Sequence, residues 1–138
     1  MKGPNSSPSN EGIGVSLVEG DATTRRSRQI MLRSAGYDVR SYATCAALLA
    51  DPRARDYPCI IVDMETEEVD CIGLLRQMRA SGWRGKGILL DGIATGNAFM
   101  QDAEMHGDKV YERSIGDGSL LAAVAASIYR GWAGWNAI

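Results

Sequence analysis

Four charged residues stand at or directly after short apolar runs in this sequence, and they are the first candidates for chemistry. Glu19 follows IGVSLV, Asp63 ends CIIVD, Asp91 follows KGILL and Arg113 follows VYE. In an open parallel sheet the ligand crevice lies beyond the carboxyl ends of the strands, so side chains at these ends share one site. A guanidinium there can grip a carboxylate with two hydrogen bonds. The alternative interpretation is that strands simply end at polar residues where they reach water.

The apolar runs predict the elements that would position these four side chains. A continuously apolar segment such as residues 59–63 is typical of a strand covered on both faces. Strands are expected at residues 13–18, 37–42, 59–63, 86–90 and 110–112, and helices at about 21–35, 44–49, 71–81, 97–105 and 117–129, with a loop over 51–58. Because strands and helices alternate, right-handed crossovers give an α/β fold with a doubly wound, five-stranded parallel sheet and five helices.

Length and composition limit the classes of protein that this chain can belong to. The 138 residues are 45% hydrophobic and 23% charged with a net charge of −2, which favours one globular domain and argues against a nucleic-acid partner. We expect a loose polar tail over residues 1–12, a domain over 13–130 and a C-terminal tail over 131–138. In that last tail Trp132 and Trp135 either fold back on the core or dock a partner.

Other sequence signals concern location and metal chemistry. The chain has no apolar run approaching 18 residues and no hydrophobic leader, so we expect a cytoplasmic protein without a membrane contact. The three cysteines, Cys45, Cys59 and Cys71, have no CxxC spacing. A zinc site or a disulfide framework is therefore not expected, and ordinary reduced thiols are.

From residue 13 to residue 128 the chain resembles a bacterial response-regulator receiver domain. The resemblance rests on an ordered set of landmarks rather than on one motif: LVE at 17–19, RR at 25–26, AGYDV at 35–39, IIVD at 60–63, LL at 74–75, MR at 78–79 and the segment 107–113. It implies the flavodoxin-like receiver fold and a role in a two-component phosphorelay. In that family the aspartate at the end of the third strand accepts a phosphoryl group, and the resemblance gives this role to Asp63.

The family's metal site is incompletely matched. Receiver domains use Mg²⁺ to neutralise charge during phosphoryl transfer. Of their acidic pair after the first strand this chain keeps Glu19, but Gly20 stands in the second position and offers no carboxylate. The set implied by the resemblance is Glu19, Asp63 and the backbone carbonyl of Glu65, and we expect Mg²⁺ to bind weakly if it binds.

Two further family positions carry changed chemistry. Asp91 stands where the family has a switch hydroxyl, and Arg113-Ser114 replaces its lysine-proline pair. A phosphoryl group on Asp63 about 5 Å from an ionised Asp91 would be repelled by roughly 3 kcal/mol per unit-charge pair at an effective dielectric near 20. We therefore expect a standing ion pair of Arg113 with Asp91 or with Asp63, which would hold one conformation without phosphate.

Three functional hypotheses follow. The first is a single-domain atypical response regulator, phosphorylated at Asp63 by a sensor histidine kinase or phosphotransfer protein and acting on a downstream protein, with a homodimer possible. The second is a pseudo-receiver that binds partners constitutively. In both, Arg25, Arg26 and Arg28 on the first helix either face solvent or steer towards an acidic partner. The third, a small enzyme or nucleotide-binding protein, is disfavoured because no phosphate-binding loop or nucleophile elbow is present, so we expect no enzymatic activity.

Overall fold

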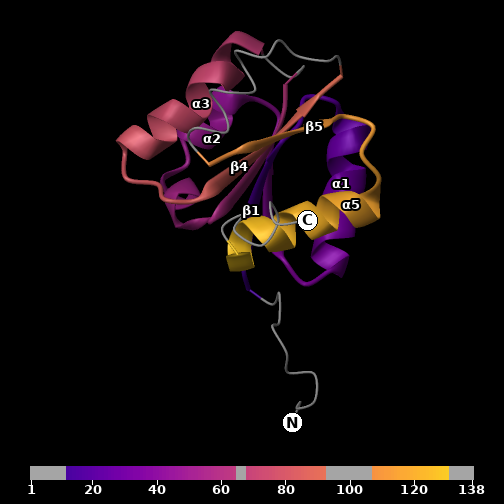
Figure 1. Ribbon diagram of the computed structural model, residues 1–138. Coiled ribbons are helices and arrows are strands. Elements are labelled where there is room, and N and C mark those ends of the chain that lie inside the picture. The colour runs from indigo at the N-terminus through magenta and orange to yellow at the C-terminus, as the bar shows by residue number, and fades with distance from the viewer. Residues whose placement is uncertain (1–11, 65–67, 93–106, 131–138) are drawn as a thin grey trace.

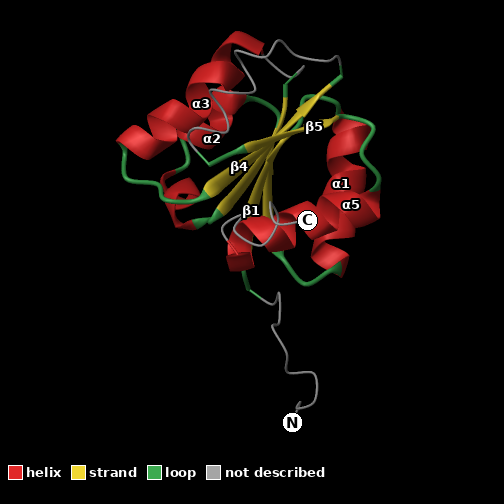
Figure 2. Cartoon of the chain, in the orientation of Figure 1, coloured by secondary structure: helices red, strands yellow, loops and turns green. Residues whose placement is uncertain are grey.

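The computed structural model describes residues 12–64, 68–92 and 107–130 and shows a parallel sheet between two layers of helices (Figures 1 and 2). The sheet has five strands in the order β2-β1-β3-β4-β5. They are β1 (Gly14–Val18), β2 (Asp38–Tyr42), β3 (Cys59–Asp63), β4 (Lys86–Asp91) and β5 (Lys109–Glu112). Every adjacent pair of strands is parallel, so the predicted fold class is confirmed.

The helices begin and end close to the positions that capping residues predict. They are α1 (Ala22–Ser34), α2 (Cys45–Leu49), α3 (Glu68–Ala80) and α5 (Asp117–Ala125), the last continuing as a π-helical segment, Ala126–Arg130. The Asp21 carboxylate accepts from Thr24 N at 2.8 Å, and the Thr44 hydroxyl accepts from Ala47 N at 3.0 Å. Each bond satisfies a backbone donor that the first turn leaves open. Gly36 ends the first unit with a φ of 99°, which favours glycine.

Two differences from the expected elements have local causes. The segment expected to be a loop contains a short 3₁₀ helix, Pro52–Asp56, because Pro52 suits the first helical position and the Asp51 carboxylate accepts from Arg53 N. Helix α3 begins at Glu68, three residues before the first apolar position of its stripe. The helix expected over 97–105 and the tail with Trp132 and Trp135 lie outside the described residues.

The core consists of two apolar clusters, one on each face of the sheet. Alternate residues of β3 divide between them: Cys59 and Ile61 pack towards α1 and α5, while Ile60 and Val62 pack towards α2 and α3. Figure 1 shows these helix pairs on opposite sides of the strands. All five residues of β3 are buried. This explains why the run is continuously apolar, as predicted, until Asp63.

Two of the three cysteines have described side chains, and both lie in the core. Cys45 and Cys59 are buried and form no disulfide bond, and burial raises the pKa of Cys59 to about 12, so this thiol stays protonated at neutral pH. Cys71 lies in α3, but its side chain is outside the described set. No helix in the described segments is long and apolar enough to cross a membrane.

Candidate functional site

Sheet register and pleat bring three of the predicted charged residues to one side of the sheet. Val18 pairs with Val62, so Glu19 and Asp63 follow at the same level. Alternation places Asp63 on the face of Ile61, which packs towards α1 and α5. Tyr111 packs on this face as well, and Arg113 stands two residues further along. The strand ends therefore direct Glu19, Asp63 and Arg113 towards the amino end of α1.

Arg113 grips the Asp63 carboxylate with both arms of its guanidinium. Its Nη2 donates to Oδ1 of Asp63 at 2.7 Å, and its Nε donates to Oδ2 at 2.9 Å and to Oδ1 at 3.1 Å. Asp63 is 2% exposed, so this pair is formed largely away from water. Of the two ion pairs that the sequence left open, the structure shows the one between Arg113 and Asp63.

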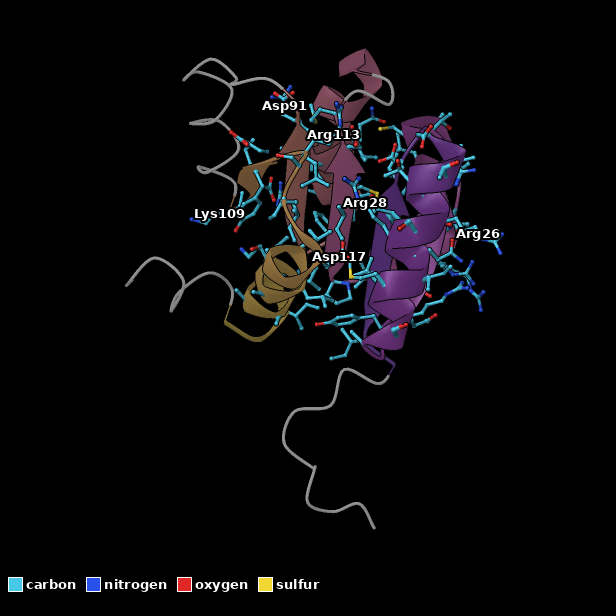
Figure 3. All side chains as sticks on the ribbon, turned by 90° about the vertical axis from the view of Figure 1, so that its right-hand side faces the viewer. Arg26, Arg28, Asp91, Lys109, Arg113 and Asp117 are labelled. Atoms are coloured by element: carbon cyan, nitrogen blue, oxygen red, sulfur yellow. The ribbon has the colours of Figure 1, made fainter. Side chains whose placement is uncertain are left out.

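Arg28 is a member of the site that the sequence interpretation placed elsewhere. Its Nη1 donates to Oε1 of Glu19 at 2.7 Å and to Oδ2 of Asp63 at 3.3 Å, and its Nη2 donates to the Arg113 carbonyl at 3.3 Å. Its side chain is 12% exposed, so the assignment of Arg28 to the outer surface of the first helix is wrong. In Figure 3, Arg28 points into the molecule beside Arg113, whereas Arg26 points away.

Helical periodicity contained the signal for this inward arginine. Leu32 is fully buried in the apolar cluster between the sheet and helices α1 and α5. Arg28 lies four residues earlier on the same face of α1, one turn closer to the carboxyl ends of the strands. Arg25, seven residues before Leu32, also faces inwards enough for its Nη1 to donate to the Glu19 carbonyl at 2.8 Å. Charge alone does not distinguish the three arginines, but helical spacing does. It places Arg25 and Arg28 towards the site and Arg26 towards solvent.

Glu19 is the second buried acid of the site. It is 5% exposed, and its Oε2 accepts from Asp21 N at 3.0 Å while Oε1 is bound by Arg28. Burial, together with the nearby Asp63 carboxylate, raises the pKa of Glu19 to about 7, against the opposing effects of the Asp21 amide and Arg28. Desolvation thus outweighs the ion pair, and this carboxyl group changes its protonation state near neutral pH.

Asp91 ends β4 beside this cluster. Asp63 pairs with Leu90 in the register, so Asp91 stands one residue further along the neighbouring strand. Its carbonyl accepts from Arg113 N at 2.8 Å, which extends the ladder between β4 and β5 by one residue and fixes where the Arg113 side chain begins. Figure 3 shows Asp91 and Arg113 at the same end of the strands, and the strand register places Glu19 and Asp63 at that end as well.

Solved structures with this fold are receiver domains and response regulators. The signal receiver domain of a putative Luxo repressor protein from Vibrio parahaemolyticus superposes with a TM-score of 0.77 at 16% identity, covering 87% of this chain and 92% of that one. The chemotaxis protein CheY4 from Vibrio cholerae gives 0.73 at 19% identity, covering 85% and 99%. The chain has the fold of a response-regulator receiver domain.

Sequence comparison points in the same direction. The transcriptional regulatory protein FixJ of Azorhizobium caulinodans is 25% identical over 120 residues, which cover 87% of this chain and 57% of FixJ. Full-length FixJ from B. japonicum superposes with a TM-score of 0.73 at 21% identity, covering 91% of this chain and 62% of that one. No protein-family model matches the chain. The chain thus spans less than two thirds of the length of the two FixJ proteins.

The predicted Mg²⁺ ligands Glu19 and Asp63 do not fit a metal ion in the arrangement observed. Both oxygens of Glu19 and both oxygens of Asp63 already accept N–H groups, and Arg28 lies between the two side chains. Mg²⁺ requires oxygen ligands in near-octahedral geometry, which a guanidinium in that position excludes. Among residues 12–64, 68–92 and 107–130, no three acidic, histidine or cysteine side chains form a metal-binding group. Glu65 lies outside these ranges.

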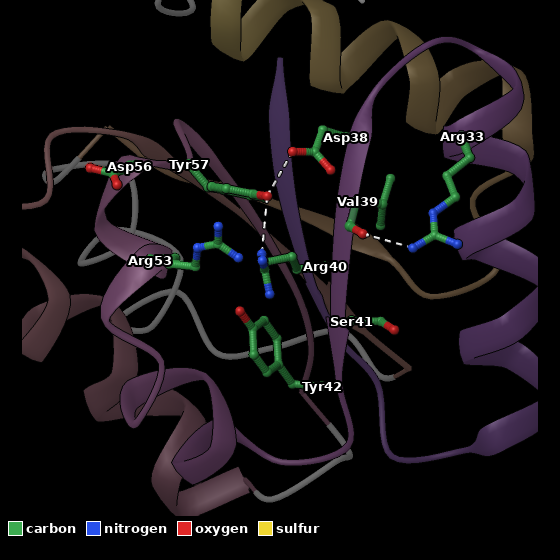
Figure 4. Close-up of a pocket in the computed structure, with 9 residues that line it drawn as sticks. All are labelled: Arg33, Asp38, Val39, Arg40, Ser41, Tyr42, Arg53, Asp56 and Tyr57. Atoms are coloured by element: carbon green, nitrogen blue, oxygen red, sulfur yellow. Dashed lines mark hydrogen bonds between the residues drawn. The ribbon is translucent and has the colours of Figure 1, made fainter. Parts of the chain in front are cut away.

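A polar groove runs along the free edge of β2, away from this site (Figure 4). Arg33 reaches the strand from α1, and its Nη2 donates to the Val39 carbonyl at 3.1 Å. On the side of β2 opposite Arg33, Nε of Arg40 donates to the Tyr57 hydroxyl, which itself donates to the Asp38 carboxylate at 2.8 Å. Arg33 thus occupies the Val39 carbonyl on the edge strand β2, and the other side chains place charge beside this strand. Both features oppose hydrogen bonding of β2 to a strand of another molecule.

Proposed function

We propose that this chain is a receiver-type signalling module that works through protein contacts and is not switched by phosphate. The observation that carries the proposal is the bidentate hold of Arg113 on Asp63. To accept a phosphoryl group, Asp63 would need an oxygen able to attack phosphorus and a cation to neutralise the charge that develops. Its oxygens instead serve as acceptors in a buried ion pair, so the resting arrangement opposes attack.

The strength of this hold follows from its surroundings. Breaking a buried ion pair by removing one partner commonly costs about 3 to 5 kcal/mol, because the remaining charge is left desolvated. Asp63 is almost fully buried, while the Arg113 side chain is 29% exposed, which places this pair towards the lower end of that range. Phosphorylation would have to displace Arg113 from Asp63. The added phosphoryl group would also be repelled by the negative charge of the nearby Asp91 carboxylate. A fixed conformation is therefore favoured over a switch.

The outer face of α1 is the contact surface that fits this function. Arg26 and Arg33 are exposed on it, and Ile30 between them is 55% exposed, the large hydrophobic residue most open to solvent in the described chain. An apolar side chain flanked by guanidiniums suits a helical partner that offers apolar and acidic groups. By the resemblance, such a partner is a sensor histidine kinase or phosphotransfer protein. A downstream target and a homodimer remain predictions.

The test is exposure to a phosphoryl donor. The protein is incubated with acetyl phosphate, or with beryllofluoride, in the presence of Mg²⁺, and its intact mass and tryptophan fluorescence are recorded. We expect no adduct and no spectral change. The Asp63→Asn variant should behave like the wild type and keep its affinity for any partner. A receiver domain of known reactivity in parallel samples confirms that the reagents are active.

The phosphorelay hypothesis makes the opposite prediction from the same site. It is favoured by one observation, that Asp63 is retained at the end of β3 beside a guanidinium fork, a geometry that can also bind a phosphoryl group. An adduct that forms on the wild type and is lost in Asp63→Asn would establish that function and end the proposal made here.

A further inference from the structure

We propose that Arg28 is a built-in cation that occupies the place of a divalent metal ion between Glu19 and Asp63. One nitrogen, Nη1, donates to both side chains, to Glu19 at 2.7 Å and to Asp63 at 3.3 Å. These are the two acidic side chains in the metal-ligand set that the resemblance to receiver domains implies. The inference rests on the proposed function, since both describe Asp63 as held by arginines, but it concerns a different residue and a different ligand.

Charge supports this assignment. Glu19 and Asp63 are both buried, and two buried carboxylates within reach of one nitrogen repel each other unless a cation lies between them. Arg113 neutralises Asp63 from the β5 side, and Arg28 supplies the second positive charge from α1. Gly20 provides no carboxylate that would favour a divalent ion over this guanidinium. The two acids are thus matched by two guanidiniums without a metal.

Arg28 also binds a third group, the backbone carbonyl of Arg113. Its Nη2 donates to the Arg113 carbonyl at 3.3 Å, so the same side chain touches residues that follow β1, end β3 and follow β5. A planar guanidinium can hold these three groups at once because its donors point in fixed directions. Arg28 thereby fixes the backbone of Arg113 while Arg113 holds Asp63.

The inference predicts that removing Arg28 creates a metal site. Binding of Mn²⁺ is measured by the electron paramagnetic resonance signal of the free ion, with the full chain in each case. We expect wild type to bind Mn²⁺ weakly and Arg28→Ala to bind it at least about tenfold more tightly, since two carboxylates lose their internal cation. The gain should disappear in Arg28→Ala/Glu19→Gln. Arg26→Ala, on the same helix but facing solvent, should match wild type.

Several outcomes would overturn the inference. One is equal Mn²⁺ affinity of wild type and Arg28→Ala, and another is a gain that survives the Glu19→Gln change. If Arg28→Ala and the milder Arg28→Gln do not fold alone, both are refolded with Mn²⁺ and followed by circular dichroism. If the guanidinium of Arg28 occupies the place of a metal ion, Mn²⁺ should be able to replace it and restore folding of these variants. Failure of Mn²⁺ to restore folding contradicts the proposal. The phosphoryl-donor experiment on wild type tests the proposed function independently of these results.

Discussion

At the scale of single residues, Glu19 and Asp63 show how burial changes what a carboxylate does. Each is almost inaccessible to solvent, and each is bound by N–H groups that take up its oxygens. For Asp63 the main partner is the guanidinium of Arg113, whereas Glu19 shares Arg28 with its neighbour. The same residue types on the surface would be separate, solvated charges. Here they form one ion-paired cluster that restrains the strand ends.

The raised pKa of Glu19 predicts how stability depends on pH. Its folded-state pKa is about 7, above the ordinary glutamate value of 4.5, so the folded protein binds this proton more tightly than the unfolded chain does. The stabilisation is fully present below pH 4.5 and is lost as the pH rises through about 7. We expect this group to lower the free energy of unfolding by about 1 to 2 kcal/mol across that window, after allowance for screening.

Urea denaturation between pH 5 and pH 8, in the presence of EDTA, measures this effect. Glu19→Gln cannot titrate, so its unfolding free energy should fall less than that of wild type over the same pH interval. Parallel pH profiles for the two proteins would show that Glu19 does not have the raised pKa.

At the scale of elements, α1 has two faces with different tasks. Leu32 and Arg28 lie on the inner stripe, where they complete the core and the charged cluster. Arg26 and Ile30 lie on the outer surface, where they are available to a partner. Because one rigid helix carries both faces, a protein docked on the outside contacts an element that is anchored at Asp63. This gives the proposed function a physical connection between contact surface and site.

The end of α3 is fastened to the sheet by a second buried ion pair, at the opposite end of the strands. Asp108 is 3% exposed and accepts from Arg79 Nη2 at 2.6 Å, Arg79 Nη1 at 2.9 Å and Gly87 N at 2.7 Å. The Arg79 guanidinium also lies over the ring of Trp83, 5.2 Å from its centroid. This arrangement joins α3 to the beginnings of β4 and β5.

Arg79→Ala should lower the free energy of unfolding by about 2 to 4 kcal/mol, because Asp108 would keep a buried charge with little compensation. Arg84→Ala is the matched control, since Arg84 is exposed nearby, and it should change stability by less than about 0.5 kcal/mol. Urea unfolding monitored by circular dichroism compares them. Similar losses in both variants would mean that the buried pair contributes nothing specific.

At the scale of the whole molecule, the site exists because three strands end beside one another and helix α1 packs against their ends. Asp63 and Asp91 terminate adjacent strands, Arg113 follows the next strand, and Arg28 arrives from a helix on one face. The charges interact across long separations in sequence, so changing one alters the electrostatic environment of all. Such coupling makes Asp91 a test of the electrostatic account.

Asp91→Thr should increase the affinity for beryllofluoride in the presence of Mg²⁺. Two like unit charges about 5 Å apart repel each other by roughly 3 kcal/mol at an effective dielectric near 20, and relief of such a repulsion corresponds to about a hundredfold in affinity. Titration followed by tryptophan fluorescence measures it. Asp56→Thr removes the same charge from an exposed position in the 3₁₀ helix and should have no effect. Unchanged affinity in Asp91→Thr would contradict the role given to charge.

The sequence by itself determined the parallel sheet, because four of the five strands are short, mainly apolar runs that end at or just before a charged residue, and all five are separated by helix-length segments. The same pattern predicted that Glu19, Asp63, Asp91 and Arg113 would gather at one edge, as the structure shows. The caps at Asp21 and Thr44 depend on local sequence alone, because each bond joins residues three positions apart.

The tertiary structure decided which charges pair. The sequence left Arg113 a choice of two carboxylates, and the shared pleat and register of the strands direct it to Asp63. Arg28 entered the site because α1 packs on the face to which Glu19 and Asp63 point, a fact about docking rather than about local sequence. Ion pairs between distant segments depend on distances of a few ångströms, and packing of the whole chain sets those distances.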